Sequence, residues 1–110
     1  MAWFLVRFQF ANASSKAMIE NPHDRHGPAK TLVESFGGKL HHYFFSFGDY
    51  DGVGIIEFPD NKSAAAFSTK AGSTGAFSKF ETTVLMPTVE AEAAMKQARD
   101  TKSAFRAPNA

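Results

Sequence analysis

The hydrophobic pattern opens with a period of two. Between residues 3 and 10, strongly apolar side chains fall on every second position. Successive side chains of a strand point to opposite faces, so this stretch predicts a strand with one apolar face. Similar runs predict further strands at residues 39–47, 53–58 and 79–86. In the first strand, one face would carry Phe4, Val6, Phe8 and Phe10, and the other Trp3, Leu5, Arg7 and Gln9.

The segments between these strands have helical spacing. A polar break at residues 12–15 predicts the cap of a short helix over 16–20, and Pro28 is expected to open a second helix, which Gly37-Gly38 ends. Asp60 is the expected cap of a third helix, followed by a loop at 72–75. A terminal helix is predicted from Pro87-Thr88 to Arg99 or Lys102. The predicted buried stripes are Ala29, Leu32, Val33 and Phe36 in the second helix and Ala64, Phe67 and Ala71 in the third.

This order predicts an α+β, ferredoxin-like βαββαβ fold with a four-stranded antiparallel sheet and an added C-terminal helix. Both crossover helices would cover one face of the sheet. The length of 110 residues suits a single domain. We expect that domain to span residues 1–103, terminal helix included, and residues 104–110 to form a frayed tail.

The second predicted strand is apolar on both faces. By strict alternation Tyr43, Phe45 and Phe47 share one face, and Leu40 and Phe44 share the other. The helices can cover only one face, and large exposed apolar patches are rare on monomers. We therefore expect a homodimer, or an assembly of dimers, in which two sheets pack face to face as a dimeric α/β barrel. In that interface a Phe45→Asp substitution would bury an unpaired charge.

Composition removes several classes of function. The chain has no cysteine, which excludes disulfides, zinc–thiolate sites and thiol catalysis by its own residues. Its net charge is +1 and its basic residues are dispersed, so nucleic acid is not an expected partner. The first residues do not read as a secretory leader, and apolar runs are too short for a membrane span. We therefore expect a cytoplasmic protein without a membrane partner.

The combined motif along the chain resembles the GYD-domain family. It consists of Gly37-Gly38-Lys39-Leu40, Tyr43, Gly48-Asp49-Tyr50-Asp51 and Glu57-Phe58-Pro59-Asp60, with Arg25 and Gly75 also fitting the pattern. The resemblance covers residues 4–86 and implies a ferredoxin-like dimeric α/β barrel of bacterial origin. It carries over no catalytic residues, and the residues after Met86 lie outside it.

The segment from Gly48 to Gly52 predicts a tight hairpin connection. Both glycines are expected at positive φ, so valine at either should destabilise the fold more than Asp49→Ala. Turn chemistry accounts for the aspartates, and Tyr50 can pack on the edge of the sheet. The alternative interpretation places Tyr50 and Asp51 at the mouth of a pocket.

The other candidate ligand-binding residues are Arg25, His42 and Tyr43. Arg25 could hold a carboxylate near the start of the following helix. His41 and His42 are consecutive in a strand, so they are expected to point to opposite faces, and the one facing a pocket could act as a base or haem ligand. Neither a metal site nor a resident cofactor is predicted from these residues.

The favoured hypothesis is a homodimer that binds a small apolar or aromatic molecule between the sheet and the helices. One alternative is a cofactor-independent monooxygenase or isomerase, or a haem-binding protein. Another is a structural or regulatory assembly module with no ligand. A pocket with converging polar groups would favour binding, and a fully packed interior would favour the assembly module.

Overall fold

The computed structural model describes residues 1–109. Residue 110, the last of the tail that was expected to fray, lies outside the described residues. The elements are β1 (Ala2–Phe10), α1 (Asn12–Glu20), α2 (His26–Ser35), β2 (Lys39–Phe45), β3 (Gly52–Phe58), α3 (Asn61–Ser73), β4 (Phe77–Leu85) and α4 (Thr88–Asp100). All the predicted strands and helices are present. The largest boundary differences are an α1 that begins earlier and an α3 that continues through Gly72 and Ser73, which were expected to lie in a loop.

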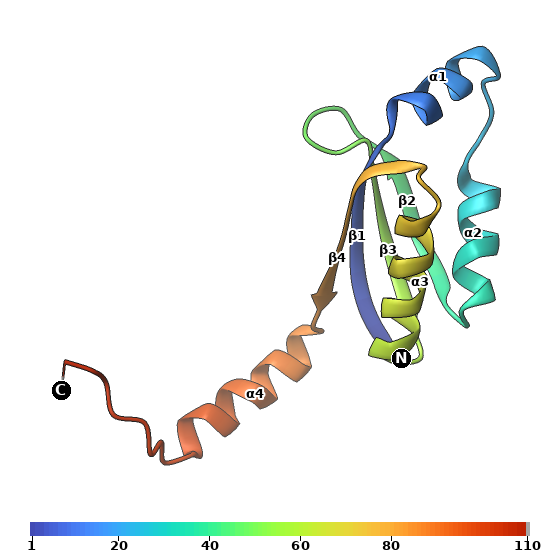
Figure 1. The fold of residues 1–110 in the computed structure, drawn as a ribbon. Coiled ribbons are helices and arrows are strands. Elements are labelled where there is room, and N and C mark those ends of the chain that lie inside the picture. The colour runs from blue at the N-terminus through green and yellow to red at the C-terminus, as the bar shows by residue number, and fades with distance from the viewer. Residues whose placement is uncertain (110) are drawn as a thin grey trace.

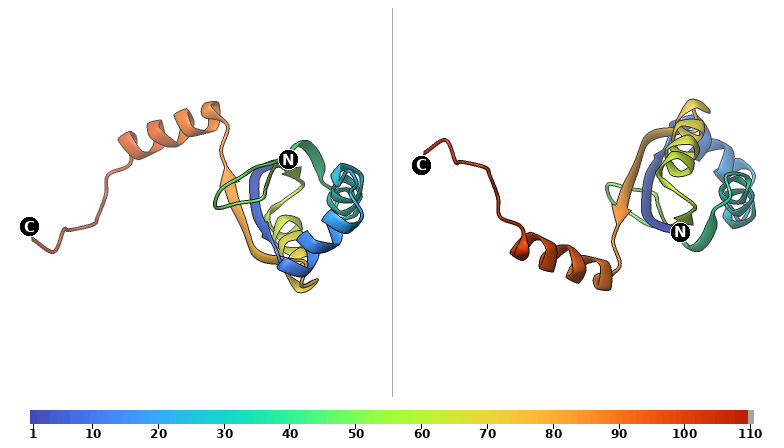
Figure 2. Two further views of the ribbon diagram at one scale, coloured as in Figure 1. Left: turned by 90° about the horizontal axis from the view of Figure 1, so that it is seen from above. Right: turned by 90° about the horizontal axis from the view of Figure 1, so that it is seen from below.

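The four strands form one antiparallel sheet in the order β2-β3-β1-β4. Figure 1 shows α2 and α3 side by side over one face of this sheet, and the first view of Figure 2 shows the other face without a helix over it. The arrangement confirms the predicted ferredoxin-like fold. We call the uncovered face the open face.

The core lies between the sheet and the helices. The predicted alternation in β1 is confirmed, since Phe4, Val6, Phe8 and Phe10 are all buried. The predicted α3 stripe is also confirmed, because Ala64, Phe67 and Ala71 are buried. Asp60 caps that helix, its Oδ1 accepting the Ser63 backbone N–H at 2.8 Å. The stripe residues therefore face the sheet as the spacing predicts.

A β-bulge in β2 changes the direction of the side chains. Leu40 pairs with Ile56, whereas His42 pairs with the preceding residue Ile55, so His41 is an extra residue in the ladder. The Nε2 of His41 lies 2.6 Å from Glu57 Oε1, and its ring stacks on Trp3 at 4.5 Å. His41 and His42 therefore both lie on the open face, and the prediction that they point to opposite faces is wrong.

The bulge also corrects the predicted interface residue. Phe45 lies on the helix side of the sheet, where its ring is 5.8 Å from those of Phe10 and Tyr43. Phe44 pairs with Val53 on the open face, while Leu40 turns towards the helices. The prediction that placed Phe45 in an interface between two sheets is therefore wrong, because strict alternation does not hold through residues 40–42.

Two glycines of the hairpin have different conformational roles. Gly48 has a φ of +137°, as expected for the turn, and a Cβ there would meet no atom of residues 1–109 within 4 Å. Gly52 does not have positive φ; it is a buried strand residue whose added Cβ would lie 2.3 Å from Phe8 Cζ. The expectation of positive φ at Gly52 is wrong, and close packing is the reason for glycine there.

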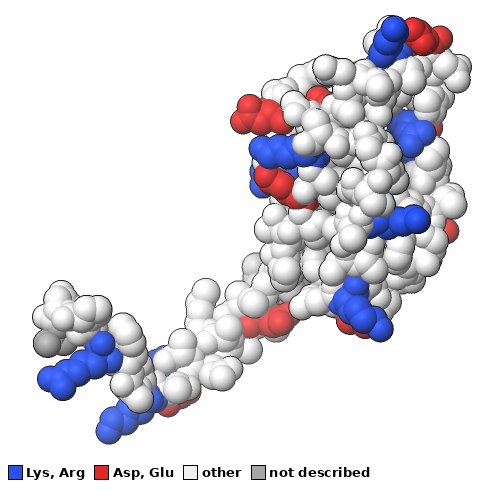
Figure 3. All heavy atoms as spheres, viewed as in Figure 1, with Lys and Arg blue, Asp and Glu red and all other residues white. Residues whose placement is uncertain are grey.

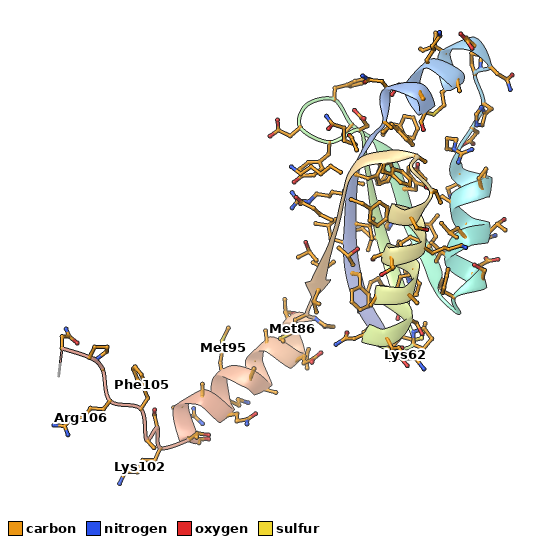
Figure 4. The ribbon with its side chains drawn as sticks, in the orientation of Figure 1. Lys62, Met86, Met95, Lys102, Phe105 and Arg106 are labelled. Atoms are coloured by element: carbon orange, nitrogen blue, oxygen red, sulfur yellow. The ribbon has the colours of Figure 1, made fainter. Side chains whose placement is uncertain are left out.

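The terminal helix α4 projects away from the two-layer body. It contains no buried residue, and the molecule is correspondingly elongated, with extents of 60 × 33 × 23 Å. Figure 4 shows Met86, Met95 and Phe105 along this projection, and each is more than half exposed. Among the described residues, none of the helices combines the length and the apolar character needed to cross a bilayer.

Candidate functional site

A cavity lies between the sheet and α2. It has a volume of about 90 Å³ and is lined largely by apolar side chains, with Arg25 and Tyr43 as its polar groups. We call it the inner cavity. Aromatic rings from β1, α3 and β4 form much of its wall. The apolar residues that define it include Val6, Phe8, Leu32, Ile56, Phe67 and Phe80.

A second, more polar pocket of about 280 Å³ lies beside it. We call this the outer pocket; it is lined by His23, Asp24, Arg25, His26, Tyr43 and Phe45. Arg25 and Tyr43 line both spaces. The two polar side chains therefore stand where the apolar interior meets the polar pocket.

The segment before α2 positions Arg25. Pro22 is the second residue of the connection after α1, where a helix is hard to continue, and Asp24 Oδ1 accepts the backbone N–H of His26 at 2.8 Å. The Nδ1 of His23 lies 2.8 Å from the carbonyl of Asn21, and its Nε2 lies 3.1 Å from Arg25 Nη1. This network assigns a neutral His23 ring that donates from Nδ1 and accepts the Arg25 N–H at Nε2.

Most of the N–H donors of Arg25 remain available to a ligand. A guanidinium has five N–H donors, and the hydrogen bond to His23 uses one of them. Within residues 1–109, Arg25 forms no ion pair with a carboxylate. A surface arginine commonly pairs with a nearby carboxylate, and Arg25 has no such ion pair within the described part of the chain.

Tyr43 is the second polar group of the cavity. Its ring packs edge-on against Phe8 at 5.9 Å, on the helix side of the sheet. Burial raises the pKa of Tyr43 to about 12, outweighing the opposite effect of the nearby Arg25 charge. The phenol therefore stays protonated at neutral pH and can donate a hydrogen bond.

Tyr50 lies on the open face, away from this cavity. Its hydroxyl donates to Glu81 Oε2 at 2.7 Å, while Arg7 and Lys79 lie over its ring at 4.5 and 4.8 Å. The hydrogen bond from Tyr50, assisted by the two cations, lowers the pKa of Glu81. Figure 3 shows basic and acidic side chains interspersed on the side of the molecule that it presents. Through its hydrogen bond to Glu81, Tyr50 connects the Gly48–Gly52 loop to β4.

Asp51 ties the same loop to the end of β1. Its Oδ2 accepts the backbone N–H of Phe10 at 2.8 Å, and its own N–H donates to the carbonyl of Phe8 at 2.8 Å. Ser46 closes the loop from the other side by donating its hydroxyl to the carbonyl of Tyr50 at 2.7 Å. The Gly-Asp-Tyr-Asp segment therefore acts through its contacts to β1 and β4.

We expect Asp51→Ala to destabilise the fold by about 1–3 kcal/mol, because the buried N–H of Phe10 would lose its acceptor. Asp49→Ala is the matched control, since Asp49 is exposed in the same loop. Urea unfolding of both variants measures the difference. Equal stabilities would show that the Asp51 carboxylate does not support the loop.

The five predicted ligand-binding residues fall into separate places. Arg25 and Tyr43 meet at the cavity, Tyr50 and His42 lie on the open face, and Asp51 binds the end of β1. The sequence reasoning did not single out the apolar wall from β4, formed by Phe77 and Phe80. They lie three positions apart, and the register shift between Gln9 and Phe10 in the β1–β4 ladder places both on the helix side, so alternation alone gave no signal for them. It also missed Glu81, whose role depends on partners distant in sequence.

Within the described residues, groups of three or more side chains arranged to hold a metal ion do not occur. His41 pairs with Glu57 alone, and the ring of His42 stacks on Phe44 at 6.0 Å. Both histidines lie on the face opposite the inner cavity. The groups available to a ligand in the cavity are therefore those of Arg25 and Tyr43.

Comparison with known proteins supports the fold and the family. A model of the GYD domain matches residues 4–95, which confirms the resemblance seen in the motif. Among solved structures, FFRP-DM1 is similar with a TM-score of 0.54 and 15% identity over 78% of this chain and 100% of that one. At3g17210 from Arabidopsis thaliana has a TM-score of 0.50 and 13% identity over 79% and 95% of the chains. Atu4242 from Agrobacterium tumefaciens has a TM-score of 0.50 and 17% identity over 79% and 93%. The curated proteins contain no match to the chain.

Proposed function

This chain belongs to the GYD domain family, and we propose that it forms a homodimer that binds a small, largely apolar molecule between its sheet and α2. The observation that carries this proposal is the inner cavity, which opens beside two polar groups that it shares with the outer pocket. Ligand sites typically combine an apolar wall with a few converging polar groups. That is the arrangement expected for binding rather than for a fully packed interior.

The sizes of the inner cavity and the outer pocket suggest which part of a ligand would occupy each of them. The inner cavity, at about 90 Å³, has room for a small apolar group, and the outer pocket, at about 280 Å³, for the remainder. Together they reach the lower end of the roughly 300–1,000 Å³ range of small-molecule pockets. The ligand is therefore a compact molecule with one apolar end.

The homodimer is supported by the open face. This face carries apolar side chains from all four strands, together with the Arg7–Glu81 ion pair. Within the described chain, the Nε of Arg7 is buried and has no hydrogen-bond partner. A second copy of the same sheet would cover the apolar residues and exclude water from them. The apolar residues of the face are Trp3, Leu5, Phe44, Val53, Ile55 and Leu85.

We expect neutral aromatic probes, indole and phenylacetamide, to raise the melting temperature, and Ala29→Leu to abolish that response. Ala29 lines the inner cavity, so a larger side chain there fills it. At one hundred times Kd a ligand stabilises the folded state by about 2.7 kcal/mol, which a thermal melt resolves easily. Thr31→Leu, which places the same side chain on an exposed position of α2, should leave the response intact.

Two outcomes would reject this function. If neither probe shifts the melting temperature, or if Ala29→Leu responds as strongly as the wild-type chain, the cavity does not bind small molecules. The assembly module would then be the better description, with the aromatic faces serving only to hold subunits together. The haem alternative required a histidine facing the cavity, and His41 and His42 lie on the other face.

A further inference from the structure

We propose that the natural ligand is a small organic carboxylate, whose carboxylate group is held by the Arg25 guanidinium and the Tyr43 hydroxyl while its apolar group enters the inner cavity. This inference rests on the proposed binding function and specifies its ligand class. Its basis is the juxtaposition of one cation and one neutral donor at the rim of an otherwise apolar space.

Arg25 supplies the charge. Its side chain is half-buried at the boundary of both spaces, and one hydrogen bond to the neutral His23 ring holds it in place. A guanidinium presents parallel N–H groups that match the two oxygens of a carboxylate. Because the His23 contact occupies one Nη1 hydrogen, several donors remain for a ligand.

Tyr43 supplies a second donor at the same rim. Among the described residues, none forms a hydrogen bond with its hydroxyl, although the residue lines both the cavity and the pocket. A protonated phenol stabilises an anion by donating to it, and its high pKa keeps the proton in place over the neutral range. A carboxylate between the two groups would receive donors from both sides.

The outer pocket also contains one acidic side chain, which already accepts a hydrogen bond from the backbone. Asp24 is the acidic residue of the outer pocket, and its Oδ1 already accepts the backbone N–H of His26 at the start of α2. An ammonium group would be repelled by Arg25, and a neutral head group would leave the guanidinium without compensation beside an apolar wall.

The test uses three probes that share one skeleton: phenylacetate, phenylacetamide and 2-phenylethylamine. Calorimetric titration of the full chain should give phenylacetate at least a tenfold lower Kd than phenylacetamide, with the amine weakest. Arg25→Gln should remove the preference for the carboxylate over the amide. Tyr43→Phe, which removes only the hydroxyl, should weaken phenylacetate several-fold. Lys16→Gln is the control for loss of one positive charge, since Lys16 lies on α1 outside both pockets.

Each result decides the proposal. If the amide binds as tightly as the carboxylate, or if Arg25→Gln leaves the carboxylate preference unchanged, the carboxylate assignment is wrong while the binding function stands. If Lys16→Gln loses the preference as fully as Arg25→Gln, the effect is net charge and the assignment is also wrong. If none of the three probes binds while indole still does, the carboxylate assignment fails and the binding function stands; if indole also fails to bind, both fail.

Discussion

Gly52→Ala should destabilise the protein by about 3 kcal/mol or more, the upper part of the range for overpacked cores. The new Cβ would lie 2.3 Å from Phe8 Cζ, far inside van der Waals contact. Such a loss is a large fraction of the roughly 5–15 kcal/mol that stabilises a typical domain. Thermal and urea unfolding would show a melting temperature lowered by more than about 10 °C.

The Phe8 ring cannot easily move aside to accept that methyl group. Its centroid lies 5.0–6.0 Å from the centroids of four other rings, so a shift would disturb the packing of β1, β2 and β4 together. These rings belong to Phe10, Tyr43, Phe77 and Phe80. Because interiors are close-packed, the clash would be shared as strain over several side chains.

Gly54→Ala is the matched control. It lies two residues further along β3 on the same face, and its added Cβ would be 3.6 Å from the nearest atom, the carbonyl oxygen of His42. We expect its stability to stay within about 1 kcal/mol of the wild-type chain. Combining Gly52→Ala with Phe8→Leu should cost less than the two single losses added together, because the smaller side chain relieves the clash. Similar stabilities of Gly52→Ala and Gly54→Ala would contradict the packing argument.

Gly52 also illustrates which parts of the fold the sequence could predict. Regular alternation in β1 and helical spacing in α3 predicted both elements and their buried faces, because one buried face leaves a periodic pattern. A glycine required by close packing carries no such pattern. Its neighbour Phe8 lies 44 positions earlier, and only the pairing of β1 with β3 brings the two together.

The bulge in β2 shows a second limit. Inserting one residue into a ladder reverses the alternation after it, and the pair His41-His42 gives no sign of where the extra residue lies. The candidate site shares this limit. Arg25 and Tyr43 could be named from their chemistry and from the motif, but their meeting depends on how the segment before α2 folds against β2. The cavity volume likewise depends on packing that no single segment determines.

The bulge leads to the last prediction, that Phe44→Asp converts the proposed dimer into monomers without unfolding them. Phe44 is 61% exposed in the single chain, so its loss costs the fold little. In a face-to-face dimer the new carboxylate would be buried without a partner, opposite the apolar side chains of the second sheet. A penalty of about 3 kcal/mol or more raises the dimer Kd at least a hundredfold.

Sedimentation velocity at micromolar concentration measures this directly. The wild-type chain should sediment as a species of twice the 12.0 kDa chain mass, and Phe44→Asp as a single chain. At concentrations low enough for both proteins to be monomeric, their melting temperatures should be equal. Ile19→Asp is the matched control, since Ile19 is 81% exposed on α1, away from the sheet face. A wild-type monomer would reject the homodimer. A Phe44→Asp variant that stays dimeric would place the interface elsewhere. The next residues to substitute would then be Val89 and Met95, the exposed apolar side chains of α4. The open face is expected to be the interface because it combines the uncovered apolar row with the buried Nε of Arg7, which has no hydrogen-bond partner within residues 1–109.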